Sequence, residues 1–236
     1  MTSPQLVSVP VTGGQLPADL HLPPGGQGPG LVLLQEIFGV NRYVTVRARD
    51  LAALGYAVLV PHVYWRQDDP VIEGGEDALA RAMAAVGKVQ WPEAVADGVA
   101  ALAALRERPE VTGPAGLIGF CFGGGLAFAV AAQPGARPDA LVSYYGSALP
   151  TLLDLAPQVT TPSLHHFGLA DDYLPPEVVR RIEAAVTAGG NATVLTYPGA
   201  GHAFDNPAPG FHDAEASRQA WAATAAWLAE HLPAAS

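Results

Sequence analysis

The stretch Gly116-Leu-Ile-Gly-Phe-Cys-Phe-Gly-Gly-Gly125 decides how this 236-residue chain is expected to fold. An apolar run leads through Gly119-x-Cys121-x-Gly123 into an Ala- and Leu-rich segment. This is the pattern of a nucleophile elbow, in which a strand turns abruptly into a helix and glycines relieve the crowding around a strained residue. We therefore expect a buried strand, Cys121 at its carboxyl end, and a helix directly after it.

Short apolar runs bounded by Gly or Pro recur along the chain, with helix-like segments between them. Runs that are apolar at every position are typical of strands buried on both faces, as in a parallel sheet. The expected strands are Leu31–Gln35, Tyr56–Pro61, Ala115–Gly119, Ala140–Tyr145, Pro162–Gly168 and Ala192–Pro198. The expected helices are Tyr43–Leu54, Glu76–Val86, Glu93–Arg106, Gly124–Gln133, Glu177–Ala188 and Ala214–Leu232.

This alternation predicts an α/β fold, a doubly wound and mostly parallel sheet with helices on both faces. The opening segments Leu6–Val11 and Ala18–Leu22 alternate more strongly and flank Gly13-Gly14, which predicts an antiparallel hairpin at the sheet edge. Asn41 is the expected N-cap of the first helix. Because no segment has the composition of a linker, we expect a single domain over residues 1–236.

The composition excludes several classes of partner. The formal net charge is −10, which would repel nucleic acid and anionic membranes. The single cysteine allows no intramolecular disulfide. The stretch from Met1 lacks the basic and apolar parts of a signal peptide. The glycine run Gly119–Gly125 matches no nucleotide-binding pattern. We expect a cytoplasmic protein, a monomer or small homo-oligomer, that uses neither metal nor cofactor.

A catalytic Cys121 needs a base, because an unassisted thiol is only a few per cent ionised at neutral pH. Asp171 and Asp172 follow one expected strand and His202 follows the next, each in a loop. Chemistry in open α/β sheets lies beyond the carboxyl ends of the strands, and the order nucleophile, acid, histidine is that of the elbow architecture. The alternatives are a small buried hydrophobe for Cys121 and a solvated loop residue for His202.

Glu36 is a further candidate, because it lies at the tip of an expected buried strand among apolar neighbours. Charged groups are rarely placed in such surroundings without a partner. The alternative is a solvated carboxylate at a strand end.

Five ordered motifs resemble the dienelactone hydrolase (carboxymethylenebutenolidase) family of α/β hydrolases over nearly the whole chain. They are Gln35-Glu36-Ile37-Phe38-Gly39, Pro61-x-x-Tyr64-x-Arg66-Gln67, Gly119-Phe-Cys-Phe-Gly-Gly124, Gly168-x-x-Asp171-x-x-x-Pro175 and Ala200-Gly-His-x-Phe204. The resemblance implies a Cys121–His202–Asp171 triad and so favours Asp171 over Asp172. It also implies that Glu36 contacts the resting thiol and assists its deprotonation, and that the amides of Ile37 and Phe122 form the oxyanion hole.

Substrate recognition is where the sequence departs from the family. Relatives that act on dienelactone hold its carboxylate with two arginines; Arg81 falls in the region of one, but Asn206 replaces the other. Arg81 has the alternative of an exposed helix residue. Tyr64 and Phe204 are expected to line an apolar pocket, or else to belong to the core. Residues 146–161 leave no room for a helical lid, so we expect an open cleft and a small substrate.

Together these features predict a hydrolase of small esters or lactones that works through a thioacyl-enzyme. The nearest alternative is a general carboxylesterase or thioesterase, which Asn206 favours. A non-catalytic small-molecule binder on the same scaffold and a redox-sensing thiol protein are the others. The complete set of nucleophile, acid and histidine counts against the binder, and the lack of a second cysteine counts against the sensor.

Overall fold

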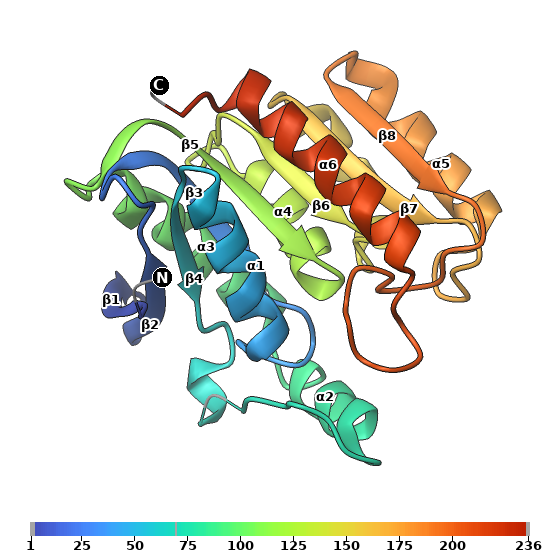
Figure 1. The fold of residues 1–236 in the computed structure, drawn as a ribbon, viewed down its shortest axis with the longest axis horizontal. Coiled ribbons are helices and arrows are strands. Elements are labelled where there is room, and N and C mark those ends of the chain that lie inside the picture. The colour runs from blue at the N-terminus through green and yellow to red at the C-terminus, as the bar shows by residue number, and fades with distance from the viewer. Residues whose placement is uncertain (1–2, 69, 235–236) are drawn as a thin grey trace.

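One sheet of eight strands runs through the molecule (Figure 1). The computed structural model describes residues 3–68 and 70–234. The strands lie in the order β1-β2-β4-β3-β5-β6-β7-β8, and only the pairs β1–β2 and β2–β4 are antiparallel. Their bounds are β1 Gln5–Val11, β2 Gly14–His21, β3 Gly28–Leu34, β4 Ala57–Pro61, β5 Val111–Phe120, β6 Leu141–Tyr144, β7 Ser163–Gly168 and β8 Ala192–Tyr197. The expected hairpin is confirmed, with β1 at the edge.

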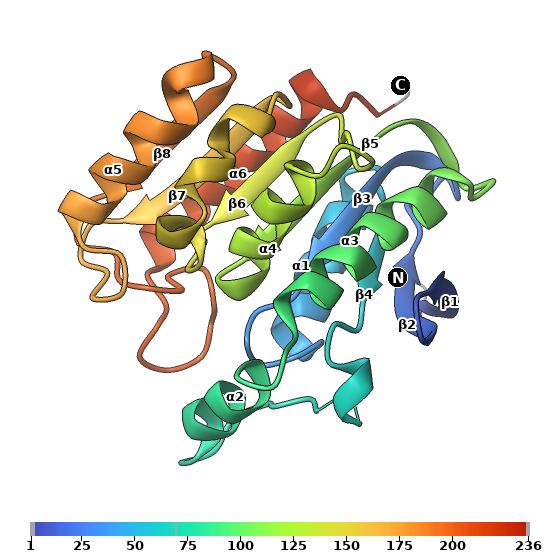
Figure 2. The same ribbon diagram turned by 180° about the vertical axis from the view of Figure 1, so that it is seen from behind.

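Helices cover both faces of the sheet, as predicted. They are α1 Arg42–Ala53, α2 Ala78–Val86, α3 Trp91–Arg106, α4 Phe122–Ala131, α5 Pro176–Val186 and α6 Ala214–His231. Crossovers between parallel strands are right-handed, so the direction of each step across the sheet decides which face its helix covers. The step from β3 to β4 runs opposite to those from β4 to β5 and from β5 to β6, which puts α1 on one face and both α3 and α4 on the other. Helix α6, which follows the last strand, lies on the same face as α1 (Figures 1 and 2).

The N-terminal ends of two helices bear on the expected bounds, and one agrees with the prediction while the other differs. Asn41 is the N-cap of α1, as predicted, because its side chain accepts a hydrogen bond from the Val44 amide (3.1 Å). Helix α4, however, begins at Phe122 and not at Gly124. Glycine disfavours helix interiors, but every residue of α4 is buried, and this packing stabilises a helix whose first turn contains three glycines.

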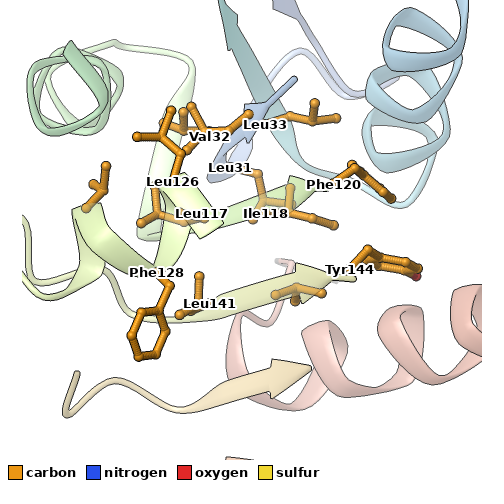
Figure 3. Packing of buried hydrophobic residues seen from close by; sticks show 14 of the residues in the cluster. Leu31, Val32, Leu33, Leu117, Ile118, Phe120, Leu126, Phe128, Leu141 and Tyr144 are labelled. Carbon is orange, nitrogen blue, oxygen red and sulfur yellow. The ribbon is translucent and has the colours of Figure 1, made fainter. Parts of the chain in front are cut away.

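Successive side chains of β5 point to opposite faces of the sheet and pack against the helices on each face (Figure 3). Leu117 lies beside Leu126 of α4, whereas Phe120 points to the other face, where its ring is 5.6 Å from Tyr43 of α1. These side chains are fully buried or nearly so. Burying a large apolar side chain contributes about 1.5–3 kcal/mol, so this packing fixes the end of β5, where Cys121 follows.

The connection between β6 and β7 consists of two short 3-10 turns, Leu149–Thr151 and Leu153–Gln158, so it carries no helical lid, as expected. Helix α2 stands apart from the sheet (Figures 1 and 2) and supplies one wall of the cavity described below. Within the described ranges, no helix has the length and apolarity needed to cross a bilayer. The N-terminal stretch in which no signal peptide is expected begins with residues 1 and 2, which lie outside the described residues.

Candidate functional site

Cys121 occupies a strained turn between β5 and α4. Its φ of 52° and ψ of −114° are rare for a residue with a side chain. The strain is held by backbone hydrogen bonds, since the Cys121 amide donates to the Tyr144 carbonyl (3.0 Å) and its carbonyl accepts from the Ser147 amide (3.1 Å). A Cβ on Gly119 would overlap the Gly123 carbonyl, so the glycines of the motif are required by close approach.

The loops after β7 and β8 bring two further side chains to the thiol. His202 Nε2 lies 3.1 Å from Cys121 Sγ, and His202 Nδ1 lies 2.7 Å from Asp171 Oδ2. Asp171 is buried, and its Oδ1 accepts hydrogen bonds from the amides of Tyr173 (2.7 Å) and Leu174 (3.1 Å). Asp172, the rival acid, is exposed. The three residues Cys121, His202 and Asp171 therefore form one continuous hydrogen-bonded set.

The electrostatics of this set favour a protonated imidazole. Burial lowers the pKa of His202, but the hydrogen bonds to Asp171 and Cys121 and the charges of both outweigh it and raise the pKa to about 10. A protonated ring donates from both nitrogens. His202 can thus donate to the Asp171 carboxylate and to the sulfur at the same time.

The two residues expected to form the oxyanion hole, Ile37 and Phe122, line the cavity together with Cys121. Phe122 is the first residue of α4, so its amide has no acceptor within the helix and lies at the positive end of the helix dipole. Ile37 follows β3, and both residues line the same cavity as Cys121. This arrangement could hold a negatively charged oxygen.

Glu36 has surroundings that differ from those implied by the resemblance. The sulfur contacts His202, whereas Glu36 Oε2 accepts a hydrogen bond from Asn206 Nδ2 (2.7 Å). Glu36 Oε1 is buried without a hydrogen-bond partner among the described residues, and Glu36 lines the cavity. Burial raises the pKa of Glu36 to about 7, although the Asn206 hydrogen bond and the charge of His202 oppose the rise.

A buried polar network beside the site was not predicted from the sequence. The Asp205 carboxylate accepts from Arg47 Nε (2.7 Å) and Nη2 (2.6 Å), from the Tyr43 hydroxyl (2.6 Å) and from the Ser217 hydroxyl (2.7 Å). The Tyr43 and Tyr145 hydroxyls are 3.2 Å apart, and the Tyr145 ring lies 5.4 Å from the His202 ring. The only signal was position, because Tyr145 follows β6 at the carboxyl edge of the sheet.

A cavity of about 200 Å³ opens beside Cys121 and His202. Besides the residues named above, apolar side chains form most of its walls: Phe38, Leu79, Met83, Val86, Tyr173, Ala203 and Phe211. The sequence signal for the α2 wall was the helical spacing of Leu79, Met83 and Val86, which indicates an apolar face but not its neighbour.

None of the four expected substrate-binding residues belongs to the cavity walls that the described residues form. Tyr64 and Phe204 are fully buried; Tyr64 donates to the Ile37 carbonyl (2.9 Å), and Phe204 packs 5.2 Å from the Tyr145 ring. Arg81 is exposed and donates to the Gly74 carbonyl (2.9 Å). Asn206 is buried against Glu36. The alternatives given for three of these residues therefore describe them better: Tyr64 and Phe204 belong to the core, and Arg81 is an exposed helix residue.

Metal-ligating side chains do not gather at the site: across residues 3–68 and 70–234, no group of three or more His, Cys, Asp or Glu could hold an ion. The donor set of the site is a thiol, an imidazole and a carboxylate in a row, in which the imidazole already contacts both neighbours. Such a row is suited to moving a proton between sulfur and ring.

Known proteins resemble this chain over most of its length. The carboxymethylenebutenolidase of Pseudomonas sp. is 36% identical over 94% of this chain and 92% of its own length, and carboxymethylenebutenolidase 1 of Cupriavidus pinatubonensis is 31% identical over 82% of each. A dienelactone hydrolase-like promiscuous phosphotriesterase from metagenomic libraries superposes with a TM-score of 0.81 at 28% identity, over 98% of both chains. The family model of the dienelactone hydrolases matches residues 16–232. The chain therefore belongs to the dienelactone hydrolase family.

Proposed function

We propose that the protein hydrolyses small esters or lactones, with Cys121 as nucleophile, His202 as acid and base, and Asp171 as the residue that orients His202. Membership in the dienelactone hydrolase family supports hydrolysis of an ester or lactone bond. The observation that carries the finer proposal is the hydrogen-bonded row Sγ–Nε2 (3.1 Å) and Nδ1–Oδ2 (2.7 Å).

In the acylation step, Sγ attacks the carbonyl carbon as a thiolate while protonated His202 stays hydrogen-bonded to Asp171. The carbonyl oxygen takes up the negative charge and accepts from the amides of Phe122 and Ile37, a kind of contact worth about 3–4 kcal/mol for each donor. When the tetrahedral adduct collapses, the bond to the leaving oxygen breaks and that oxygen takes the proton from His202 Nε2. The product is a thioester on Cys121.

In the deacylation step, neutral His202 accepts a proton from a water molecule, and the hydroxide formed attacks the thioester carbonyl. Sulfur leaves as a thiolate beside the protonated ring, which restores the starting charges. Thiolate is a better leaving group than alkoxide, so this chemistry suits substrates whose own leaving group is good, such as enol lactones.

The test is a hydrolysis panel of dienelactone, a neutral aryl ester and a short thioester, run with wild type and Cys121→Ala. Cys121→Ala should abolish hydrolysis of every substrate that the wild type cleaves, while circular dichroism shows an unchanged fold. Activity that survives in Cys121→Ala would refute the nucleophile and favour other chemistry at this site.

A matched pair of variants tests the acid. Asp171→Asn should lower kcat by roughly 10³–10⁴-fold, because the amide can no longer hold the imidazole in the required orientation and charge state. Asp172→Asn, one residue away and exposed, should leave kcat unchanged. Equal effects of the two substitutions would contradict the assignment.

A further inference from the structure

Exposed apolar side chains gather at the mouth of the cavity. Leu79 and Met83 of α2 are 45% and 54% exposed, and Tyr173 is 64% exposed. Seven large hydrophobic residues are exposed in the described part of the chain, and these three line the same cavity. Clustered exposed apolar surface marks a place where an apolar group binds.

Apart from His202, which Asp171 and Cys121 already engage, the described walls offer no cation to neutralise a substrate carboxylate. Among the described lining residues there is no Lys or Arg, and His202 is already bonded to Asp171 and Cys121. Arg81 lies on α2 but donates to the Gly74 carbonyl. Glu36 adds a carboxyl oxygen, Oε1, that has no hydrogen-bond partner among the described residues. An anionic group held here would lose its hydration and gain no cationic partner.

The mechanism decides which part of an ester meets the α2 wall. The leaving oxygen must lie near His202 Nε2, on the side where the Tyr173 ring is 5.0 Å from the His202 ring. The carbonyl oxygen lies at the amide of Phe122, whose ring packs 5.8 Å from Trp91, the first residue of α3. Leu79, Met83 and Val86 of α2 line the same cavity as Cys121, and the acyl group is assigned to this wall.

We propose that this cavity selects uncharged esters with a short apolar acyl group, which packs against Leu79, Met83 and Val86, and rejects esters whose acyl group ends in a carboxylate. The inference rests on the function proposed above and names its substrate class. It differs from recognition of an anionic lactone, which a pair of arginines would support.

Two isosteric esters test the selectivity: p-nitrophenyl 5-methylhexanoate and the p-nitrophenyl monoester of glutaric acid. The acyl group of the first ends in an isopropyl group, and that of the second ends in a carboxylate of the same shape. With a common leaving group, kcat/KM for the neutral ester should exceed that for the anionic ester on the order of a hundredfold. From acetyl to butyryl esters, kcat/KM should rise about three- to fourfold for each methylene. Equal values for the two isosteres would overturn the proposal.

A substitution on α2 locates the selectivity. Met83→Arg should lower the neutral-to-anionic ratio of kcat/KM at least about tenfold by supplying a cation to the carboxylate. Ala84→Arg adds the same charge at the next, exposed residue, which does not line the cavity, and should leave the ratio unchanged. Equal responses of the two variants would contradict an α2 wall.

Failure of this inference can be told apart from failure of the catalytic proposal. Loss of both activities in Cys121→Ala together with equal wild-type rates for the isosteres refutes the selectivity alone. Hydrolysis that persists in Cys121→Ala refutes the nucleophile, whatever the ratio.

Discussion

Replacing Glu36 by glutamine should make the stability of the protein less dependent on pH. Burial raises the pKa of Glu36 from an ordinary 4.5 to about 7. Between these values the folded protein holds a proton that the unfolded chain has released, so the free energy of unfolding falls as the pH rises through this window. At 1.36 kcal/mol for each pH unit, the loss amounts to about 2–3 kcal/mol between pH 5 and pH 8. Glutamine keeps the shape and cannot ionise.

Urea unfolding of the wild type and Glu36→Gln at pH 5 and pH 8 measures this effect. The stability of Glu36→Gln relative to wild type should increase by about 2–3 kcal/mol from the lower to the higher pH. Glu230→Gln, at an exposed position near the end of α6, should show no such increase. If the difference in free energy of unfolding between Glu36→Gln and wild type is the same at pH 5 and pH 8, the pKa of Glu36 is not raised by folding, and the reasoning is refuted.

Three other substitutions test separate parts of the account. Asp205→Ala should lower the free energy of unfolding in urea by about 3–5 kcal/mol, because it removes the buried carboxylate that pairs with the Arg47 guanidinium and leaves that guanidinium only the partly exposed Asp50; a loss below 1 kcal/mol would contradict this role. Gly123→Ala should abolish activity and soluble expression, because its Cβ would overlap the Leu34 carbonyl; normal yield and activity would show that the elbow tolerates a side chain. Cys121→Ser should retain little esterase activity, since a hydroxyl needs a stronger base, and wild-type kcat would argue against thiolate chemistry.

Local patterns in the sequence were enough to predict the sheet and to bring Cys121, His202 and one of two neighbouring acids to its edge, and the family resemblance favoured Asp171 of the two. The glycines around Cys121 reflect close backbone approach, and strands apolar at every position identify a parallel sheet whose carboxyl ends meet. Asp171 and His202 then come together because each follows a strand. The fold also makes the choice of Asp171 over Asp172 understandable, since only the former is buried.

Features that depend on the path of the chain could not be predicted in this way. Arg47 and Asp205 are 158 positions apart, so no local pattern links them. Tyr64 is aromatic and follows a strand end, but such a residue suits a core position and a pocket wall equally well. The apolar spacing on α2 indicates an apolar face but not its neighbour, and in the structure Leu79, Met83 and Val86 of that helix line the cavity.

The most direct test of the central claim is intact-mass analysis of the enzyme quenched with acid during turnover of p-nitrophenyl butyrate. A Cys121 nucleophile predicts a population heavier by one butyryl group, with the added mass confined to the peptide that contains Cys121 and absent from Cys121→Ala. An acyl group on any other side chain, or turnover by Cys121→Ala at the wild-type rate, would contradict it.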